Sequence, residues 1–258
     1  MGALTARVFY IVNILLVACL IAANHYIGVP FWWYIILALL SVSYLFFACI
    51  NLSWSFFIPS LCHAETSERV VALSFDDGPA AYTGEILDVL RKEGVEASFF
   101  CIGRNISGKE DTLRRLHAEG HVIGNHSFSH HFWFDMWGAA KMTLDMADMD
   151  KEVQRATGLK PLLFRPPYGV INPNLAAAIR RGGYTTIGWS VRSFDTSIKD
   201  EQKLLSRITD SLAPGDVILL HDSMAITAAI LPELIGRIKA KGFNIIRLDK
   251  MLNIAPYA

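Results

Sequence analysis

The chain has 258 residues and carries 24 basic and 24 acidic side chains, so its formal net charge is zero. This balance gives no reason to expect nucleic acid or an acidic polymer as a partner. With 52% hydrophobic and 19% charged residues, and a mean hydropathy of +0.33, the chain is too apolar for an ordinary soluble protein of its length. The excess lies in the first sixty residues, and the remaining part, about 190 residues, is long enough for one globular core.

Two apolar blocks open the chain, at residues 8–23 and 31–50. The second contains about 20 residues without a charge, the length that crosses a bilayer core. The first is shorter and contains Asn13, and a cleaved signal peptide is its alternative explanation. Because a second apolar block follows at once, we expect a hairpin of two transmembrane helices within an anchor over residues 1–60. The aromatic stretch at residues 54–61 is expected to lie at the membrane interface.

The orientation of this hairpin is only weakly indicated. Arg7 precedes the first apolar block and the loop at residues 24–30 has no lysine or arginine. The positive-inside rule therefore favours a cytoplasmic N-terminus, and a hairpin would return the following domain to that side. One arginine leaves the side of the membrane open.

The four cysteines show no C-x-x-C spacing, which indicates neither a disulfide framework nor a thiolate zinc site.

Beyond residue 66, short apolar runs rich in β-formers alternate with amphipathic segments of helical period. The predicted strands are residues 70–75, 97–102, 122–125, 162–164, 184–190, 216–220 and 244–248. The predicted helices are residues 83–93, 109–119, 151–157, 174–181 and 230–241, and each stops at a glycine. Seven strands that alternate with helices predict parallel pairing, and so an α/β barrel or a doubly wound sheet.

Ionisable and turn-forming residues follow five of these strands. They are Asp76-Asp77-Gly78-Pro79, His126-Ser127-Phe128-Ser129-His130-His131, Arg165-Pro166-Pro167-Tyr168-Gly169, Asp195, and His221-Asp222. Each group has an ordinary structural explanation by itself, such as a tight turn, a helix cap or a core histidine. Because the carboxyl ends of barrel strands form a single rim, however, all five groups are expected to meet there. Such a cluster favours a common functional site.

Two imidazoles and one carboxylate form a three-ligand site with an open position, which is typical of catalytic zinc and also suits other divalent metals such as iron. A metal held in this way polarises a carbonyl group and lowers the pKa of bound water. A second carboxylate beside it can act as a general base, and a more distant histidine as a general acid. The residue types therefore predict metal-assisted hydrolysis.

The order and spacing of these motifs resemble the polysaccharide deacetylases, the NodB-homology group of carbohydrate esterases. The motif residues are 74–79, 126–130, 165–169, 189–191 with Asp195, and 219–222. The resemblance covers residues 66–252 and implies a distorted (β/α)7 barrel after the two transmembrane helices. It also implies a hydrolase that acts on non-peptide carbon–nitrogen bonds. The expected substrates are N-acetylated or related acylated amino sugars of a polysaccharide or a lipid-linked glycan.

Carried over by position, the resemblance assigns Asp77, His126 and His130 to the metal. Zinc is the expected ion, and cobalt, nickel and iron(II) are the alternatives. Asp76 would be the general base toward the metal-bound water. Arg165 would keep that carboxylate ionised.

The same resemblance assigns the remaining roles. The backbone N–H of Tyr168 would stabilise the tetrahedral oxyanion together with the metal. His221 would protonate the departing amine, and Asp195 would keep its imidazole charged and oriented. Pro167, Tyr168 and Trp189 would contact the substrate.

Three positions depart from the family pattern: Arg192 stands where an acidic residue is usual, Thr196 replaces a tryptophan, and Ala80 replaces a frequent asparagine. These changes bear on the substrate and on the pKa of His221, and not on the metal or the base. The alternative function is a non-catalytic, membrane-tethered carbohydrate-binding protein. The expected partners are carbohydrate and membrane lipid, without nucleic acid, in a multi-pass protein of a bacterial cytoplasmic membrane.

Overall fold

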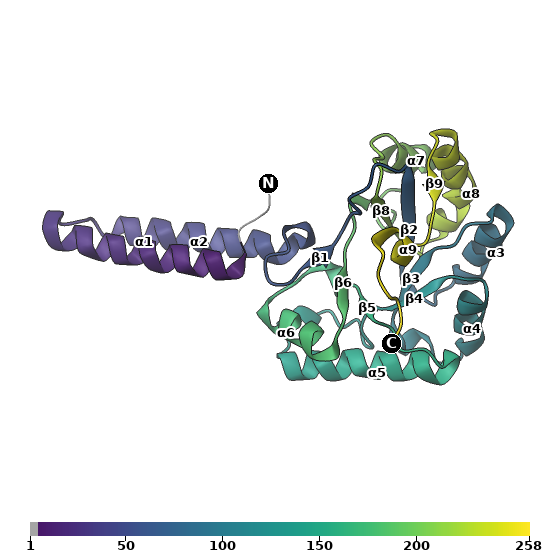
Figure 1. The fold of residues 1–258 in the computed structure, drawn as a ribbon, viewed down its shortest axis with the longest axis horizontal. Coiled ribbons are helices and arrows are strands. Elements are labelled where there is room, and N and C mark those ends of the chain that lie inside the picture. Colours follow the sequence, from purple (N-terminus) through teal and green to yellow (C-terminus); the bar gives the residue numbers. More distant parts are fainter. Residues whose placement is uncertain (1–4) are drawn as a thin grey trace.

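The computed structural model describes residues 5–258 and consists of a long helical hairpin attached to an α/β domain (Figure 1). Residues 1–4 of the predicted anchor lie outside the described part. The hairpin helices are α1 (Ala6–Ile27), which ends at Gly28 with φ 68°, and α2 (Trp32–Ile50). Both are long and apolar enough to cross a membrane, and only 6% of the most apolar window of each is buried. Core helices of a soluble protein are mostly buried, and these two helices are not.

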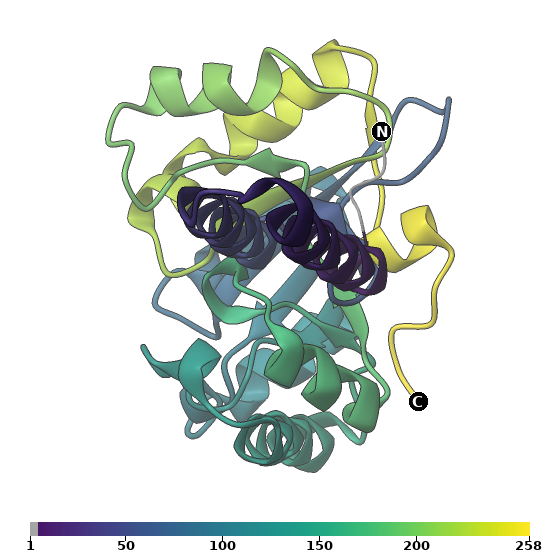
Figure 2. The same ribbon diagram turned by 90° about the vertical axis from the view of Figure 1, so that its left-hand side faces the viewer.

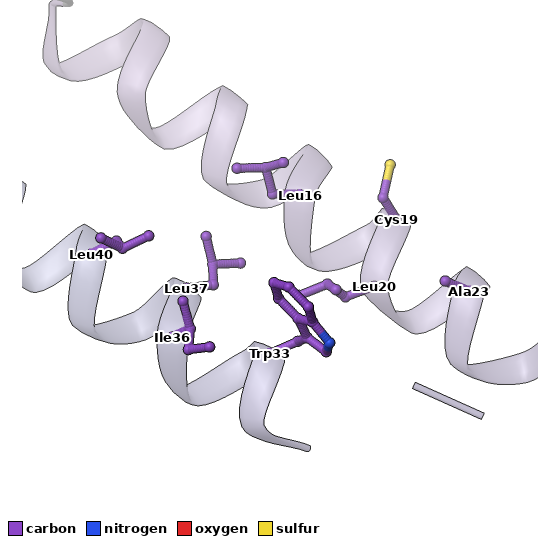
Figure 3. A pocket seen from close by; sticks show the side chains of 8 residues that line it. All are labelled: Leu16, Cys19, Leu20, Ala23, Trp33, Ile36, Leu37 and Leu40. Atoms are coloured by element: carbon purple, nitrogen blue, oxygen red, sulfur yellow. The ribbon is translucent and has the colours of Figure 1, made fainter. Parts of the chain in front are cut away.

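The two helices of the hairpin face each other with polar side chains at one level along their length and with apolar side chains at another. The Ser41 hydroxyl on α2 donates to the side-chain oxygen of Asn13 on α1, whose amide in turn donates to the Phe9 carbonyl at 2.9 Å. Hydrogen bonds of this kind join helices in an apolar medium. Nearer the connecting loop, an apolar pocket of about 370 Å³ lies between the two helices (Figure 3). Its lining is formed by Leu16, Cys19, Leu20, Ala23, Trp33, Ile36, Leu37 and Leu40.

An aromatic cluster, here called the root cluster, joins the hairpin to the α/β domain. The Phe56 side chain is only 3% exposed, and its ring centroid lies 5.6 Å from that of Phe9 and 5.7 Å from that of Tyr44. The Phe56 carbonyl also accepts a hydrogen bond from the N–H of Ala6. Residues 54–61, expected at the membrane interface, therefore pack partly inside the protein, because apolar partners for Phe56 are supplied by both hairpin helices.

Nine parallel strands form one curled sheet in the order β1-β6-β5-β4-β3-β2-β8-β7, with β9 paired to β2. The strands are β1 Ser60–Leu61, β2 Val70–Gly78, β3 Ser98–Cys101, β4 Val122–Asn125, β5 Leu163–Phe164, β6 Thr185–Ile187, β7 Val191–Arg192, β8 Asp216–His221 and β9 Asn244–Ile245. Within residues 5–258 no backbone pairing joins the edge strands β1 and β7. The predicted parallel α/β architecture is confirmed, with the barrel open along one side.

Helices cover the outside of the sheet, and the core lies between the two layers. They are α3 Thr83–Glu93, α4 Glu110–Ala118, α5 Ala139–Thr157, α6 Pro173–Gly182, α7 Glu201–Thr209, α8 Ala225–Ala240 and α9 Leu248–Leu252. Short 3₁₀ turns occupy η1 Leu52–Trp54, η2 Gly103–Asn105, η3 Phe134–Met136 and η4 Pro167–Gly169. Figure 2 looks along the hairpin from its free end and shows the domain extending on both sides of it.

The predicted helix at residues 83–93 is confirmed to the residue, but other boundaries differ. Helix α5 begins at Ala139 rather than at residue 151, because Met142 and Met146 extend its buried face. The predicted strand at residues 244–248 is divided between β9 and α9. The short elements β1, β7 and α7 were not expected. The strands β1 and β7 have only two residues each and so no period to detect, whereas α7 buries Leu204, Leu205 and Ile208 at helical spacing, a signal that was available in the sequence.

We predict that Phe56→Ala detaches the hairpin from the barrel without unfolding the barrel. Removing a buried phenylalanine side chain costs about 3–5 kcal/mol in packing, whereas the barrel keeps its own core. Chymotrypsin should then cut detergent-solubilised protein faster near Trp54 and Phe57, while the thermal transition of the barrel is retained. Phe31→Ala, at an aromatic side chain 59% exposed in the hairpin loop, is the matched control. Equal cleavage of both variants would contradict the role of the root cluster.

Candidate active site

Two neighbouring carboxylates end the central strand β2, and a bulge brings them to the same place. Successive side chains of a strand normally point to opposite faces. Here the pairing of β2 with β3 shifts between Asp76 and Gly78, and Asp77 has φ 76°. As a result both carboxylates approach Nε2 of His126, with Asp76 Oδ2 at 3.8 Å and Asp77 Oδ1 at 3.7 Å. Bulges that redirect a side chain in this way are frequent at active sites.

Asp77, His126 and His130 together form a candidate metal site. One potential ligand atom from each residue lies within 4.8 Å of the others, and His130 Nε2 is 3.6 Å from Asp77 Oδ1. The Nδ1 atom of His126 lies 2.7 Å from the carbonyl oxygen of Arg165, so this nitrogen carries the proton and leaves the Nε2 lone pair free for a ligand. Burial lowers the pKa of His126 to about 3, which keeps its imidazole neutral. This donor set fits a divalent metal.

Side chains from outside the predicted motifs hold the loop that carries both histidines. The Asp145 carboxylate on α5 accepts from the backbone N–H of Phe128 at 2.8 Å and of Ser129 at 3.3 Å. The Asn125 side chain accepts from the N–H of Ser127 at 2.8 Å. The loop therefore relies on neighbouring side chains for backbone hydrogen bonds that no helix or strand supplies.

A buried network in turn fixes Asn125. Its amide donates to Asp150 Oδ1 at 2.8 Å, and the Tyr184 hydroxyl donates to Asp150 Oδ2 at 2.7 Å. Asn125, Asp145 and Asp150 were not among the predicted site residues, since Asn125 ends a predicted strand and the helix that carries Asp145 and Asp150 was expected to begin only at residue 151. The available signal was the set of acidic residues before position 151, which alternate with methionines at the spacing of one helix face.

The general-base candidate is held by a fully buried arginine. Arg165 donates from Nη1 to Asp76 Oδ1 at 2.7 Å and to Ser74 Oγ at 2.9 Å, and from Nη2 to the Gly188 carbonyl at 2.9 Å. Its guanidinium lies 4.0 Å from the ring centroid of Phe100. Burial raises the pKa of Asp76 above its usual range, although the Arg165 charge and hydrogen bond oppose this change. A carboxylate with a raised pKa is a stronger proton acceptor once ionised.

The general-acid candidate lies at the end of β8. His221 is in register with Asp76 on the adjoining strand β2, and its Nδ1 lies 2.7 Å from Asp195 Oδ1. Thr227 donates to the second Asp195 oxygen at 2.7 Å. Burial by itself lowers the pKa of His221, but the hydrogen bond and charge of Asp195 outweigh it and raise this pKa to about 9. The imidazole is therefore protonated at neutral pH, as a general acid requires.

The substrate-side residues predicted from the sequence flank this centre. Tyr168 is 48% exposed, has φ 60°, and its ring centroid lies 4.7 Å from that of His130. Trp189 packs against Gly169, where a Cβ atom would lie 2.5 Å from the indole and φ is +70°. Only glycine allows this close approach. Pro167 is buried, and its contact with substrate stays a prediction.

The unusual Arg192 does not enter the acid centre. Its guanidinium lies 4.8 Å from the ring centroid of Phe194 and 5.9 Å from that of Trp189. Both Asp195 oxygens are instead engaged by His221 and Thr227. The substitution therefore changes the surface beside Trp189 rather than the partner of His221.

We predict that Asp145→Ala weakens metal binding about 10–100-fold, the usual range for loss of a group that orients ligands. Asp145→Asn should retain most of the affinity, because its amide oxygen can accept the same two backbone N–H groups. Asp148→Ala, at a carboxylate on the same helix that pairs with Lys151 instead, is the matched control. Metal dissociation constants measured by competition with a chelator check this order. Equal affinity in the Asp145 and Asp148 alanine variants would exclude the positioning role.

Comparison with known proteins identifies the family. The family model described as polysaccharide deacetylase matches residues 63–187. A peptidoglycan-N-acetylglucosamine deacetylase of Bacillus cereus is 32% identical over 196 residues, which cover 72% of this chain and 89% of the relative. The peptidoglycan-N-acetylmuramic acid deacetylase PdaA of Bacillus subtilis is 32% identical over 192 residues, covering 72% of this chain and 73% of PdaA.

A solved structure supports the same conclusion. The Bc1960 peptidoglycan N-acetylglucosamine deacetylase, crystallised with 4-naphthalen-1-yl-N-oxidanyl-benzamide, matches with a TM-score of 0.73 at 27% identity. The match covers 77% of this chain and 95% of that one. The strand-end motifs lie at one rim of the curled sheet, and a relative is matched over most of its length. The chain therefore belongs to the polysaccharide deacetylase family.

Proposed function

We propose that this enzyme hydrolyses the N-acetyl group of an amino sugar in a glycan, releasing acetate and leaving a free amine. The observation that carries the proposal is the placement of a buried carboxylate, Asp76, between a metal-type ligand set and a protonated histidine, His221. The relatives named above are amidohydrolases of acetylated sugars, which supports the same reaction class. A non-catalytic carbohydrate-binding role has less support, because every predicted ligand, base and acid is present.

A divalent metal held by Asp77, His126 and His130 would polarise the acyl carbonyl and acidify a water molecule. The mixed nitrogen and oxygen donors make zinc the first candidate, and the same donors accept cobalt, nickel or iron(II). The protein's own part is to keep the His126 imidazole neutral and to direct the Nε2 atoms of both histidines at the Asp77 carboxylate.

The two proton transfers are assigned to Asp76 and to His221, which is paired with Asp195. Asp76 takes a proton from the attacking water, and Arg165 stabilises the carboxylate before this step. The backbone N–H of Tyr168 donates to the oxygen that gains charge in the tetrahedral intermediate. His221 then gives its proton to the sugar nitrogen as the carbon–nitrogen bond breaks, and Asp195 stabilises the imidazolium until that moment.

We further propose that the hairpin anchors the enzyme in a membrane. Its apolar side chains face outward, as shown by Leu39 at 62% and Leu40 at 64% exposure. A cleaved signal sequence is disfavoured, because Phe9 on α1 belongs to the root cluster. The proposed division is an anchor over residues 1–60 and a catalytic domain over residues 66–252, with β1 joining the sheet from the anchor. Two spans would place the barrel on the side of the N-terminus.

The substrate is proposed to be a glycan near the bilayer. The loop that carries Arg165 and Tyr168 is bonded to the end of α2, where the N–H of Ile171 donates to the Cys49 carbonyl at 2.8 Å. Peptidoglycan, on which the named relatives act, and a lipid-linked amino sugar both meet this requirement. Acetate release from a panel of both kinds of glycan distinguishes them.

We predict that Asp76→Asn and Asp77→Asn have different consequences although the residues are neighbours. Asp77→Asn removes a charged ligand, so the purified protein should be inactive and depleted of metal. Asp76→Asn removes the proton acceptor, so the protein should be inactive but keep its metal. Metal content and deacetylation of an acetylated amino sugar are measured on the same detergent-solubilised samples. Equal metal loss would make Asp76 a ligand, and full activity of Asp76→Asn would refute the mechanism.

We also predict that activity falls as pH rises through the pKa of His221, because the general acid must be protonated. A bound divalent cation offsets the carboxylates that help to raise this pKa, so the alkaline limb of kcat/KM is expected at or below pH 9. Asp195→Asn should move this limb to lower pH, since the imidazolium loses its partner. His221→Ala should lower turnover ~10²–10⁴-fold with metal content unchanged. An unmoved limb in Asp195→Asn would remove Asp195 from this role.

A further inference from the structure

Most of the exposed large hydrophobic side chains of the described α/β domain belong to one stretch of its sequence. Five of the six lie between residues 132 and 168, and the sixth is Phe194. Three of them form a group directly after the metal-binding histidines, here called the apolar rim: Phe132 at 69%, Trp133 at 59% and Met136 at 72% exposure. A cluster of this kind beside a functional site marks a contact surface more often than chance exposure does.

The packing of the short helix η3 determines which of its side chains face away from the protein. Phe134 is 1% exposed and belongs to the same apolar cluster as Leu52, the second residue beyond α2. In a 3₁₀ turn, residues three apart lie above one another on one side. Trp133 and Met136 therefore share a side, and Phe134 occupies a different one that faces the protein.

The rim also lies next to the point where α2 ends. The Asn172 amide donates to the carbonyl of Asp135, within η3, at 2.5 Å, and the N–H of the adjoining Ile171 donates to the Cys49 carbonyl at 2.8 Å. One hydrogen-bonded path thus connects α2, the active-site loop and η3. A span that crosses a bilayer leaves it at this end, so the rim is at the level of the lipid headgroups.

Basic side chains accompany the hairpin at the same end. Arg7 is exposed in the first turn of α1, and the exposed Arg180 of α6 donates to the Phe57 carbonyl at 3.2 Å, beside the root cluster. Arginines beside apolar and aromatic side chains are typical of surfaces that contact lipid headgroups. This combination favours a lipid bilayer over a soluble protein as the partner that the apolar rim contacts.

We propose that Trp133 and Met136 insert into the headgroup region of the bilayer that α1 and α2 cross. The inference rests on the proposed membrane anchor and adds a second contact, on the catalytic domain itself. Together the two contacts hold the His126–His130 loop against the membrane, so the enzyme acts on amino sugars presented at the bilayer surface.

The test uses the full chain in liposomes with a fluorophore on a single accessible cysteine. In a Cys19→Ala, Cys49→Ala background, Met136→Cys is labelled and compared with Lys203→Cys, an exposed position on α7 remote from the hairpin. Nitroxide lipids should quench the label at 136 and leave the label at 203 bright. A label on native Cys19, with Cys49→Ala, reports whether α1 is in the bilayer at all.

The outcomes separate the two proposals. Quenching at positions 19 and 136 supports the inference. Quenching at 19 without quenching at 136 overturns it and leaves the anchor intact, whereas a bright label at 19 overturns the anchor and the inference together. In a second arm, Trp133→Ser should lower deacetylation of an amino sugar on a bilayer-embedded lipid and spare a soluble acetylated oligosaccharide. Equal losses on both substrates would show that Trp133 stacks on the glycan instead.

Discussion

The buried guanidinium of Arg165 is the interaction on which the rest of the site depends. A charge taken out of water must be paired and hydrogen-bonded, and Arg165 pairs with Asp76 and donates from its Nη atoms to Ser74 and the Gly188 carbonyl, while its buried Nε has no partner among the described residues. Its own carbonyl accepts from His126. One residue therefore contacts the candidate base, determines the tautomer of a candidate metal ligand and joins three strand ends. Any shift of the barrel that disturbed this pairing would disturb the chemistry.

The candidate acid and the candidate base differ in the charge of the side chain with which each is paired. Asp76 and His221 stand in register on adjoining parallel strands. Asp76 faces the Arg165 cation, which opposes the rise of its pKa on burial, and His221 faces a buried carboxylate that raises its pKa. Opposite charges on neighbouring strands favour each other, so an ionised Asp76 and a protonated His221, the states from which the proposed mechanism starts, stabilise one another.

The hairpin and the barrel form one unit because the link between them is short and bonded on both sides. Phe56 packs among the hairpin helices, and β1 pairs with β6 in the sheet. The hydrogen bond from Ile171 to Cys49 adds a direct tie from α2 to the active-site loop. Movement of the site relative to the hairpin is thereby restricted.

The sequence by itself determined the parallel α/β class, the two apolar helices and the ligand, base and acid candidates, because periodicity, glycine stops and motif spacing are local signals. It did not determine the open side of the sheet, since two-residue strands such as β1 and β7 have no period to read. Only the tertiary structure revealed the bulge that brings Asp77 beside Asp76, and the support of the histidine loop by Asp145 and Asn125. The bulge depends on a shift in strand pairing, and the Asp145 contact joins residues 17 positions apart, while Asn125 is itself fixed by Asp150 from another element, and none of these leaves a pattern in the sequence.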